Sequence, residues 1–306
     1  MTVQDALERA KQMAKARESR AAPASARAAA SSPIGWAEPA AAAVAAPVRV
    51  PATGYAPAEP RHTVPLPAFA VRPYDPAQCT QNRVLVPETR AASSDAHASA
   101  AYRILRARLL QRVRGENWTA VGLTSPGPSE GKSLTAVNLA LTIAAERNND
   151  VFLLDLDLRN PSIARYLGVT PPRDIASYLS GTCSAEEVLF SIGIEHLVLA
   201  GSAVSDEHAS ELLANRRLHE LLGYIRRIAA RPLVIVDMPP VLNTDDALVV
   251  APQLEAMIMV VGEGRTRRDG LERAAELLSD YNLAGIVLNH SRESLQEYYG
   301  GSYGSS

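Results

Sequence analysis

The feature that most constrains the fold is a regular alternation, beginning near residue 96, of short apolar runs with segments of helical periodicity. Near-continuous runs of Val, Ile and Leu separated by helices are typical of a mostly parallel sheet covered by helices on both faces. The sequence therefore predicts one doubly wound α/β domain over residues 96–290. The expected strands are 119–124, 151–157, 194–200, 232–238, 256–262 and 284–289, and the main expected helices are 96–113, 131–147, 212–230 and 268–281.

The chain before this domain has a different composition. Residues 21–95 are rich in Ala, Pro and Ser and show no sustained period, which predicts a disordered linker because such a segment buries too little apolar surface to offset its ordering entropy. Residues 1–20 carry a short apolar stripe that predicts a short helix, either a frayed helix or a docking peptide for a partner. Residues 291–306, rich in Gly, Ser and Tyr, are expected to form a flexible tail.

Charge and cysteine content exclude several classes of protein. The net charge of −2 gives no indication of nucleic-acid binding. Cys79 and Cys183 are isolated, which predicts neither a disulfide framework nor a metal cluster and fits a reducing cytoplasm. The acidic residues near the start do not fit an export signal, and no apolar run reaches the roughly 18 residues of a membrane span.

Lysine is scarce in this chain. Of the 31 basic residues, 28 are arginine, and the only lysines are Lys11, Lys15 and Lys132. A chain that uses arginine wherever a positive charge suffices is expected to keep a lysine for a task that arginine cannot perform. Lys132 is the only lysine in the predicted domain.

Lys132 lies in the stretch SPGPSEGKS, residues 125–133, between the first predicted strand and a long predicted helix. In a phosphate loop at this place, Gly131 permits close approach of the backbone, Lys132 reaches the outer phosphates, and the Ser133 hydroxyl reaches Mg²⁺. The strict pattern GxxxxGK[ST] is broken because Pro126 occupies the first glycine position. An ordinary turn with an incidental lysine is the alternative, and the strand–loop–helix context weakens it. The residues of this stretch expected to contact a nucleotide are Gly127, Ser129, Glu130, Gly131, Lys132, Ser133 and Leu134.

Three acidic residues are expected at the ends of strands. Asp155 and Asp157 follow the run VFLLDLD, and Asp237 ends LVIVD. The carboxyl ends of parallel strands meet at the edge of the sheet where ligands bind, and carboxylate oxygens are ligands that Mg²⁺ prefers. The three acids beside the phosphate loop therefore predict a nucleotide–Mg²⁺ site of the P-loop NTPase type.

These motifs resemble those of the bacterial tyrosine autokinases of exopolysaccharide and capsule synthesis. The resemblance covers residues 96–306 and rests on SPGPSEGKS, VFLLDLDLRNP, LVIVDMPP and the terminal stretch EYYGGSYGSS. The exosortase-associated subgroup looks closest. The resemblance implies an ATP- and Mg²⁺-dependent kinase that phosphorylates its own terminal tyrosines and thereby regulates exopolysaccharide synthesis or export.

The resemblance also assigns roles to individual residues. It implies that Lys132 and Asp157 contribute to catalysis and that Asp155 is the general base. It also implies that Ser133, Asp157 and Asp237 hold the metal. Arg159, in the pattern DxDxR, is expected to position phosphate or a neighbouring subunit, and Asn289 to contact the adenine. The phospho-acceptors are expected to be Tyr298, Tyr299 and Tyr303.

One position departs from the family pattern Glu-x-x-Arg-x-x-Arg, through which subunits assemble into rings. Arg103 and Arg106 match, but Ala100 replaces the glutamate. The resemblance implies a homo-oligomer, and Ala100 casts doubt on its assembly as a ring. The alternative functions are a non-kinase P-loop ATPase switch that controls a polysaccharide-export partner, and a scaffold with a bound nucleotide.

The resemblance also implies a partner and a location. Kinases of this family work with a membrane-spanning polysaccharide co-polymerase that activates them. Because this sequence shows no membrane span, that partner is expected to be a separate chain. The protein is then expected in the cytoplasm, at the inner face of the inner membrane.

Overall fold

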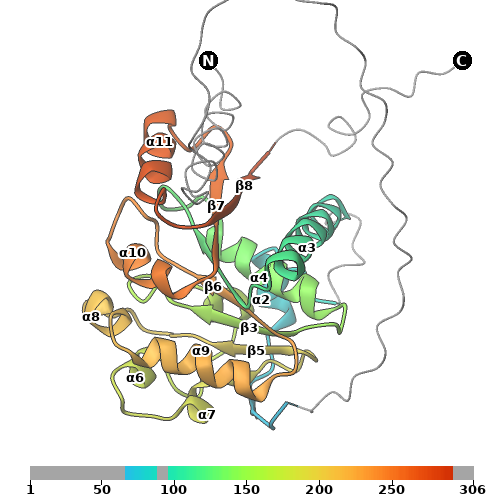
Figure 1. Cartoon of the computed structure of the whole chain (residues 1–306). Coiled ribbons are helices and arrows are strands. Elements are labelled where there is room, and N and C mark those ends of the chain that lie inside the picture. Colours follow the sequence, from blue (N-terminus) through green and yellow to red (C-terminus); the bar gives the residue numbers. More distant parts are fainter. Residues whose placement is uncertain (1–65, 88–95, 292–306) are drawn as a thin grey trace, which may run out of the picture.

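The computed structural model describes residues 66–87 and 96–291, which form one α/β domain around an eight-stranded sheet (Figure 1). The strand order is β1-β4-β5-β3-β6-β2-β7-β8, with helices on both faces. The predicted fold class is therefore confirmed. The strands are β1 (Ala70–Val71), β2 (Ala120–Thr124), β3 (Asp150–Asp155), β4 (Phe190–Ser191), β5 (Leu197–Ala200), β6 (Pro232–Asp237), β7 (Ala256–Gly262) and β8 (Leu283–Asn289).

The helices differ widely in length, and the longest, α3, lies on the outside of the domain (Figure 1). They are α2 (Pro76–Gln81), α3 (Ala96–Glu116), α4 (Lys132–Ala144), α5 (Ile163–Leu167), α6 (Ile175–Leu179), α7 (Ala185–Val188), α8 (Ala209–Leu213), α9 (Arg217–Ile228), α10 (Asp246–Val250), the 3₁₀ helix η2 (Ala251–Gln253) and α11 (Arg268–Leu277).

Strand pairing sets the position of the predicted acidic residues. Strands β5, β3, β6, β2, β7 and β8 are parallel to one another, whereas β4 runs antiparallel to β5. In the pairing of β3 with β6, Asp155 lies directly opposite Asp237. Both acids therefore end neighbouring strands at the same edge of the sheet.

The sheet separates two hydrophobic cores. One face packs against helices α6 and α8–α11, with Phe152 and Val236 among its buried strand residues. The other face packs against α3, α4 and α5, with Leu153 and Ile235 facing that way. Because successive residues of a strand point to opposite faces, the near-continuous apolar runs supply both cores at once.

The boundaries of the strands agree closely with the sequence prediction in the centre of the sheet. Strand β7 spans the predicted 256–262, and β8 begins one residue earlier than predicted. The predicted strand 151–157 ends at Asp155, so Asp157 lies in the turn that follows, and the predicted strand 194–200 begins only at Leu197.

The predicted linker over residues 21–95 is wrong for residues 66–87. This segment adds β1 to the sheet beside β4 and places α2 against α5. Its Cys79, Val84, Leu85 and Val86 are almost completely buried. The amide of Asn138 in α4 ties the segment down, because its Oδ1 accepts a hydrogen bond from the Leu85 N–H at 2.8 Å. Residues 1–65 and most of the predicted tail, 292–306, lie outside the described residues.

The two edges of the sheet differ. The edge at β1 consists of a strand of only two residues. At the edge formed by β8, the Arg112 guanidinium of α3 donates a hydrogen bond to the carbonyl of Ala284. Within the described ranges, none of the helices has both the length and the apolar character needed to cross a membrane.

The contribution of residues 66–87 can be measured by substitution. Val86→Ala removes apolar volume from a fully buried site and is expected to lower the free energy of unfolding by about 2 kcal/mol. Val71→Ala, at a position that is 55% exposed, should change it by less than about 0.5 kcal/mol. Urea denaturation of the full chain measures both values. Equal and small effects would show that the segment adds nothing to the stability of the domain.

Candidate nucleotide-binding site

The loop between β2 and α4 has the backbone of an anion-binding turn. Gly131 precedes the first residue of α4 with a φ of +86°, in the left-handed region that favours glycine. Ser129 has a φ of +62°, an unfavourable value for a residue with a side chain. As the N-cap residue, Gly131 has no side chain that could cap the first turn of α4, which leaves the N–H groups of this turn to a ligand.

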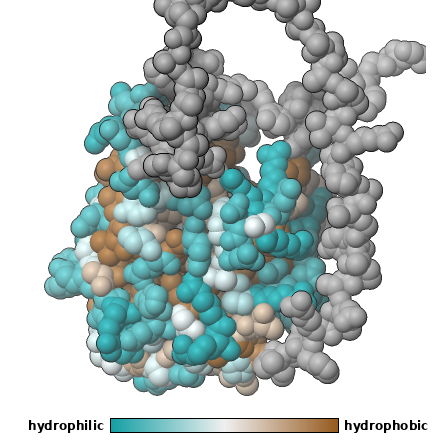
Figure 2. Space-filling model, viewed as in Figure 1, coloured by the Kyte–Doolittle hydropathy of each residue, from teal (hydrophilic) through white to brown (hydrophobic). Residues whose placement is uncertain are grey.

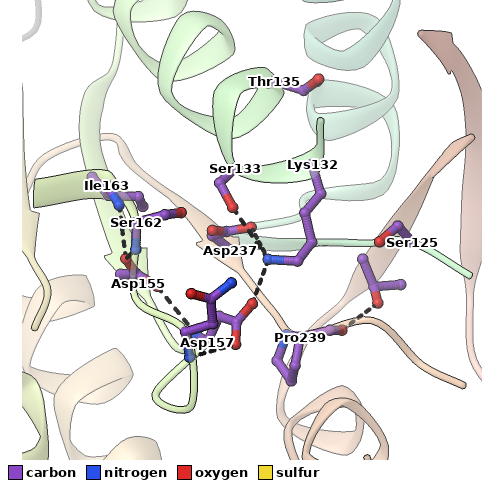
Figure 3. A network of polar contacts seen from close by, with 12 residues as sticks. Ser125, Lys132, Ser133, Thr135, Asp155, Asp157, Ser162, Ile163, Asp237 and Pro239 are labelled. Carbon is purple, nitrogen blue, oxygen red and sulfur yellow. Dashed lines mark hydrogen bonds and ion pairs between the residues drawn. The ribbon is translucent and has the colours of Figure 1, made fainter. Parts of the chain in front are cut away.

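Lys132 forms a buried ion cluster at the head of this helix (Figure 3). Its ammonium lies 2.6 Å from an Asp157 carboxylate oxygen and 3.4 Å from Asp237 Oδ1, and it is 3.1 Å from the Ser133 Oγ. The side chains of Lys132 and Asp157 are less than 10% exposed, and that of Asp237 is fully buried. The structure thus brings together four of the predicted site residues.

Burial and charge oppose each other in this cluster. Burial alone would lower the pKa of Lys132, but the charges of Asp237 and Asp157 raise it above its ordinary value. Burial raises the pKa of Asp237, and the Lys132 ammonium counteracts part of that rise. The lysine is therefore a fixed positive charge that holds two carboxylates together in a region shielded from water.

Asp155 faces the turn after β3. Its Oδ2 accepts hydrogen bonds from the N–H groups of Ser162 and Ile163, at 2.9 and 3.0 Å, and its Oδ1 accepts one from the Asp157 N–H (Figure 3). Burial, with the charge of Asp237, raises the pKa of Asp155 to about 7. A carboxyl group with this pKa can exchange a proton near neutral pH, as a general base must. Its role as the base stays a prediction.

The residues around Lys132 suit a hard divalent cation. Asp237 Oδ2 is buried and has no hydrogen-bond partner among the residues that the structure describes, and an unsatisfied carboxylate oxygen at such a place is costly. Together with Asp157 and the Ser133 hydroxyl, it forms an all-oxygen donor set of the kind that Mg²⁺ prefers. The three predicted metal ligands therefore fit the ion.

A second group of contacts connects the phosphate loop to the turn after β7. The Glu130 carboxylate is buried and accepts hydrogen bonds from the N–H of Gly262, at the end of β7, and from the Thr266 hydroxyl. A side chain at position 262 would collide with this carboxylate. The turn after β7 therefore holds the phosphate loop in place through Glu130, which lies 136 positions before Thr266 in the chain.

The end of β8 contacts the same loop residue. Asn289 Nδ2 donates a hydrogen bond to the Glu130 carbonyl at 2.9 Å, and a Cβ at Gly131 would collide with that amide. The Arg265 guanidinium adds a contact to the Ser129 carbonyl at 3.3 Å. Asn289, predicted to contact the adenine, is thus placed beside the loop as a support of its backbone.

Other predicted residues have partners outside the Lys132 cluster. Arg159 forms an ion pair with the buried Asp246 at 2.7 Å instead of joining the Lys132 cluster. Leu134 is half-buried and packs against the core, and the Gly127 carbonyl accepts a hydrogen bond from Ser125. Tyr298, Tyr299 and Tyr303 lie outside the described residues.

Sequence reasoning missed Gly262 and Thr266. A glycine at the end of a strand was a visible signal, since it marks a close approach of another group. Thr266 carried no signal, because its partner Glu130 is far away in the sequence.

No family model matches this chain. It is similar to the tyrosine-protein kinase YwqD of Bacillus subtilis (strain 168), with 29% identity over 201 residues, which cover 65% of this chain and 84% of that protein. The tyrosine-protein kinase CpsD of Streptococcus agalactiae is 28% identical over 194 residues, covering 62% of this chain and 82% of that protein. Among solved structures, the kinase domain of VpsO is 28% identical with a TM-score of 0.58, and the match covers 66% of this chain and 100% of that domain.

The position of the Lys132 ammonium leads to a prediction about metal binding. Lys132→Met removes the charge that neutralises Asp157 and Asp237, so the nucleotide-free variant should bind Mn²⁺ at least about tenfold more tightly than the natural chain, the factor that about 1.4 kcal/mol of lost electrostatic competition implies. Mn²⁺ titration followed by electron paramagnetic resonance measures this affinity. Adding Asp237→Asn to the variant should abolish the gain. Equal affinities for the natural chain and Lys132→Met would contradict the prediction.

The contact of Thr266 with Glu130 leads to a second prediction. Thr266→Val keeps the volume but leaves a buried carboxylate without one donor, so ADP should bind about tenfold more weakly, as the loss of one hydrogen bond to a charged group implies. Thr266→Ser restores the hydroxyl and should restore the affinity. Isothermal titration calorimetry with ADP and Mg²⁺ measures both. The prediction fails if Thr266→Val and Thr266→Ser bind ADP alike.

Proposed function

We propose that this chain, which belongs to the family of bacterial tyrosine-protein kinases, transfers the γ-phosphoryl group of ATP to tyrosine hydroxyls of its own C-terminal segment. The family predicted from the motifs is confirmed, and the exosortase-associated subgroup stays a prediction. The observation that carries the proposal is the burial of Lys132 between Asp157 and Asp237 at the head of α4. In a kinase of this kind the reaction regulates exopolysaccharide synthesis or export.

The reaction needs positioning and charge neutralisation more than covalent chemistry. The N–H groups of the loop and of the first turn of α4 bind phosphate oxygens, and Lys132 turns from the two acids toward the outer phosphates. Ser133, Asp157 and Asp237 would hold Mg²⁺, which would neutralise charge on the phosphates when bound.

The accepting tyrosine must lose its proton as the new bond forms. A tyrosine hydroxyl has an ordinary pKa near 10, so a nearby base is required. Asp155, with a pKa of about 7, is the candidate for this role. A movement of the turn at Ser162 and Ile163 would free its Oδ2 for the hydroxyl.

The acceptors that we propose are Tyr298, Tyr299 and Tyr303, and the phosphoryl donor is ATP. A separate membrane-spanning co-polymerase is the proposed activating partner, and it would hold the kinase at the inner face of the membrane. Each added phosphate brings about −1.5 to −2 charges, so the phosphorylated tail differs strongly from the unmodified one in its electrostatic interactions.

Incubation of the purified full chain with γ-labelled ATP and Mg²⁺ tests this function. The natural chain should become labelled, Lys132→Met should not, and a variant with Phe at all three tyrosine positions should lose at least about nine tenths of the label because the acceptor hydroxyls are absent. Phosphopeptide mass spectrometry locates the modified residues. The triple Phe variant should keep its affinity for ADP, which controls for an intact nucleotide site.

The other outcomes identify the alternatives. Release of inorganic phosphate without labelled protein would support an ATPase switch that controls an export partner, a reading that Ala100 favours. Nucleotide binding with neither reaction would support a scaffold.

A further inference from the structure

The position of Asp157 depends on the turn that follows β3, because the strand itself ends at Asp155. The last contact with β6 before this turn is the hydrogen bond from the Leu156 N–H to the Asp237 carbonyl, at 2.8 Å. Inside the turn, the Asn160 N–H donates to the carbonyl and to Oδ1 of Asp157, at 3.0 and 3.2 Å. These contacts shape the turn but do not attach it to the chain after β6. A cation held by Asp157 and Asp237 together requires a fixed separation of the two carboxylates, because Mg²⁺ demands near-ideal coordination geometry.

Arg159 connects this turn to the segment that follows β6. Its Nε lies 2.7 Å from Asp246 Oδ2, and its Nη2 donates a hydrogen bond to Asp246 Oδ1 at 3.3 Å. Its Nη1 donates to the Glu207 carbonyl at 3.3 Å. A guanidinium that binds a carboxylate at two points fixes the orientation of both groups as well as the distance between them. The turn that carries Asp157 is therefore attached to the first residue of α10.

Asp246 is held in place by two helices. It begins α10, whose Ala247 and Val250 are fully buried in the core. The hydroxyl of Ser210, in α8, donates a hydrogen bond to Asp246 Oδ1. Helices α8 and α10 lie side by side (Figure 1). The carboxylate that receives Arg159 therefore has little freedom to move.

The burial of Asp246 distinguishes this ion pair from those at the surface. Hydrophilic residues cover much of the surface seen in Figure 2, and ion pairs between exposed side chains contribute little because water competes for each charge. The Asp246 side chain is only 1% exposed, and it is the most buried of the acids that pair with an arginine within the described ranges. A carboxylate at this place that lost its guanidinium would keep an uncompensated buried charge. The pair is therefore a lasting connection.

This connection matters most when Lys132 leaves the acids. In the structure, the ammonium lies 2.6 Å from Asp157 and 3.4 Å from Asp237, and it holds both carboxylates. In the reaction proposed above, the lysine turns toward the phosphates, and two neighbouring carboxylates repel each other once the cation between them is gone. The pair of Arg159 with Asp246 does not involve Lys132, so it stays when the lysine moves.

We propose that Arg159 and Asp246 are positioning residues whose ion pair keeps Asp157 at the separation from Asp237 that a divalent cation bound with the nucleotide requires. Arg159 acts through the turn and touches neither the phosphates nor the metal. The inference rests on the nucleotide–Mg²⁺ site of the proposed function, but not on the transfer of a phosphoryl group.

Calorimetry of the full chain with ADP, once with Mg²⁺ and once with EDTA, tests this role. The ratio of the two ADP affinities measures how much the metal contributes to nucleotide binding. Asp246→Asn should lower this ratio about tenfold, the lower end of the loss for residues that orient metal ligands, and should leave the ADP affinity in EDTA unchanged. Arg216→Gln, which removes an exposed ion pair with Glu220, is the matched control and should change neither value. An unchanged ratio in Asp246→Asn would overturn the proposal.

A double variant separates the positioning role from stability. Arg159→Gln leaves Asp246 buried without its cation and should lower the thermal midpoint. Arg159→Gln combined with Asp246→Asn removes both charges and should recover most of the midpoint. The affinity ratio of the double variant should stay as low as that of Asp246→Asn alone, because the two residues act as one unit. Recovery of the ratio together with the midpoint would overturn the proposal, since it would assign the pair to stability alone.

The ADP affinity in EDTA distinguishes this role from a direct contact with phosphate. If Arg159→Gln weakens ADP binding as strongly in EDTA as with Mg²⁺, the guanidinium binds the phosphates itself and the positioning role is overturned. Arg159→Lys keeps the charge but cannot bind a carboxylate at two points, so it should also lower the ratio. All of these measurements report binding. A chain that binds ADP and Mg²⁺ but labels no tyrosine would contradict the proposed function and leave this inference intact.

Discussion

The ion cluster of Lys132 with Asp157 and Asp237 is the constraint on which the rest of the site depends. Removing three charged groups from water is costly and is tolerated only when each has a partner of opposite sign. Here two acids share one ammonium, so one negative charge is not neutralised, and Asp237 Oδ2 has no partner in the part of the chain that the structure describes. The pairing of β3 with β6 holds Asp237 in place through backbone hydrogen bonds, and the turn that follows β3 carries Asp157 to the same edge of the sheet.

The same need for rigidity explains the supports of the phosphate loop. Ser129 and Gly131 both have left-handed backbone conformations, which a free loop would not maintain for a serine. Glu130, between them, is held on its side chain by the turn after β7 and on its carbonyl by Asn289 at the end of β8. Two strands that contribute no acid to the ion cluster thus determine the shape of the loop that surrounds it.

The sequence predicted the parts of this arrangement that depend on local pattern. The run AMIMVVG predicted β7 to the residue, and the scarcity of lysine singled out Lys132 before any geometry was known. It did not predict the packing of residues 66–87, because Val84, Leu85 and Val86 are a short apolar run in an Ala- and Pro-rich region, and their burial depends on α4 and α5. Arg159 was misleading for a similar reason, since the DxDxR pattern does not reveal Asp246 as its partner. Contacts between residues that are distant in the sequence depend on the tertiary structure, and a local sequence pattern does not reveal them.

The edges of the sheet restrict how copies of this protein can associate. A strand added by a second molecule would find only two residues to pair with at β1, and at β8 the guanidinium of Arg112 already occupies the Ala284 carbonyl. Short or blocked edges are a means by which proteins prevent their sheets from growing from one molecule into the next. These two edges therefore favour assembly of copies through side chains on helices and loops over assembly through a continuous intermolecular sheet.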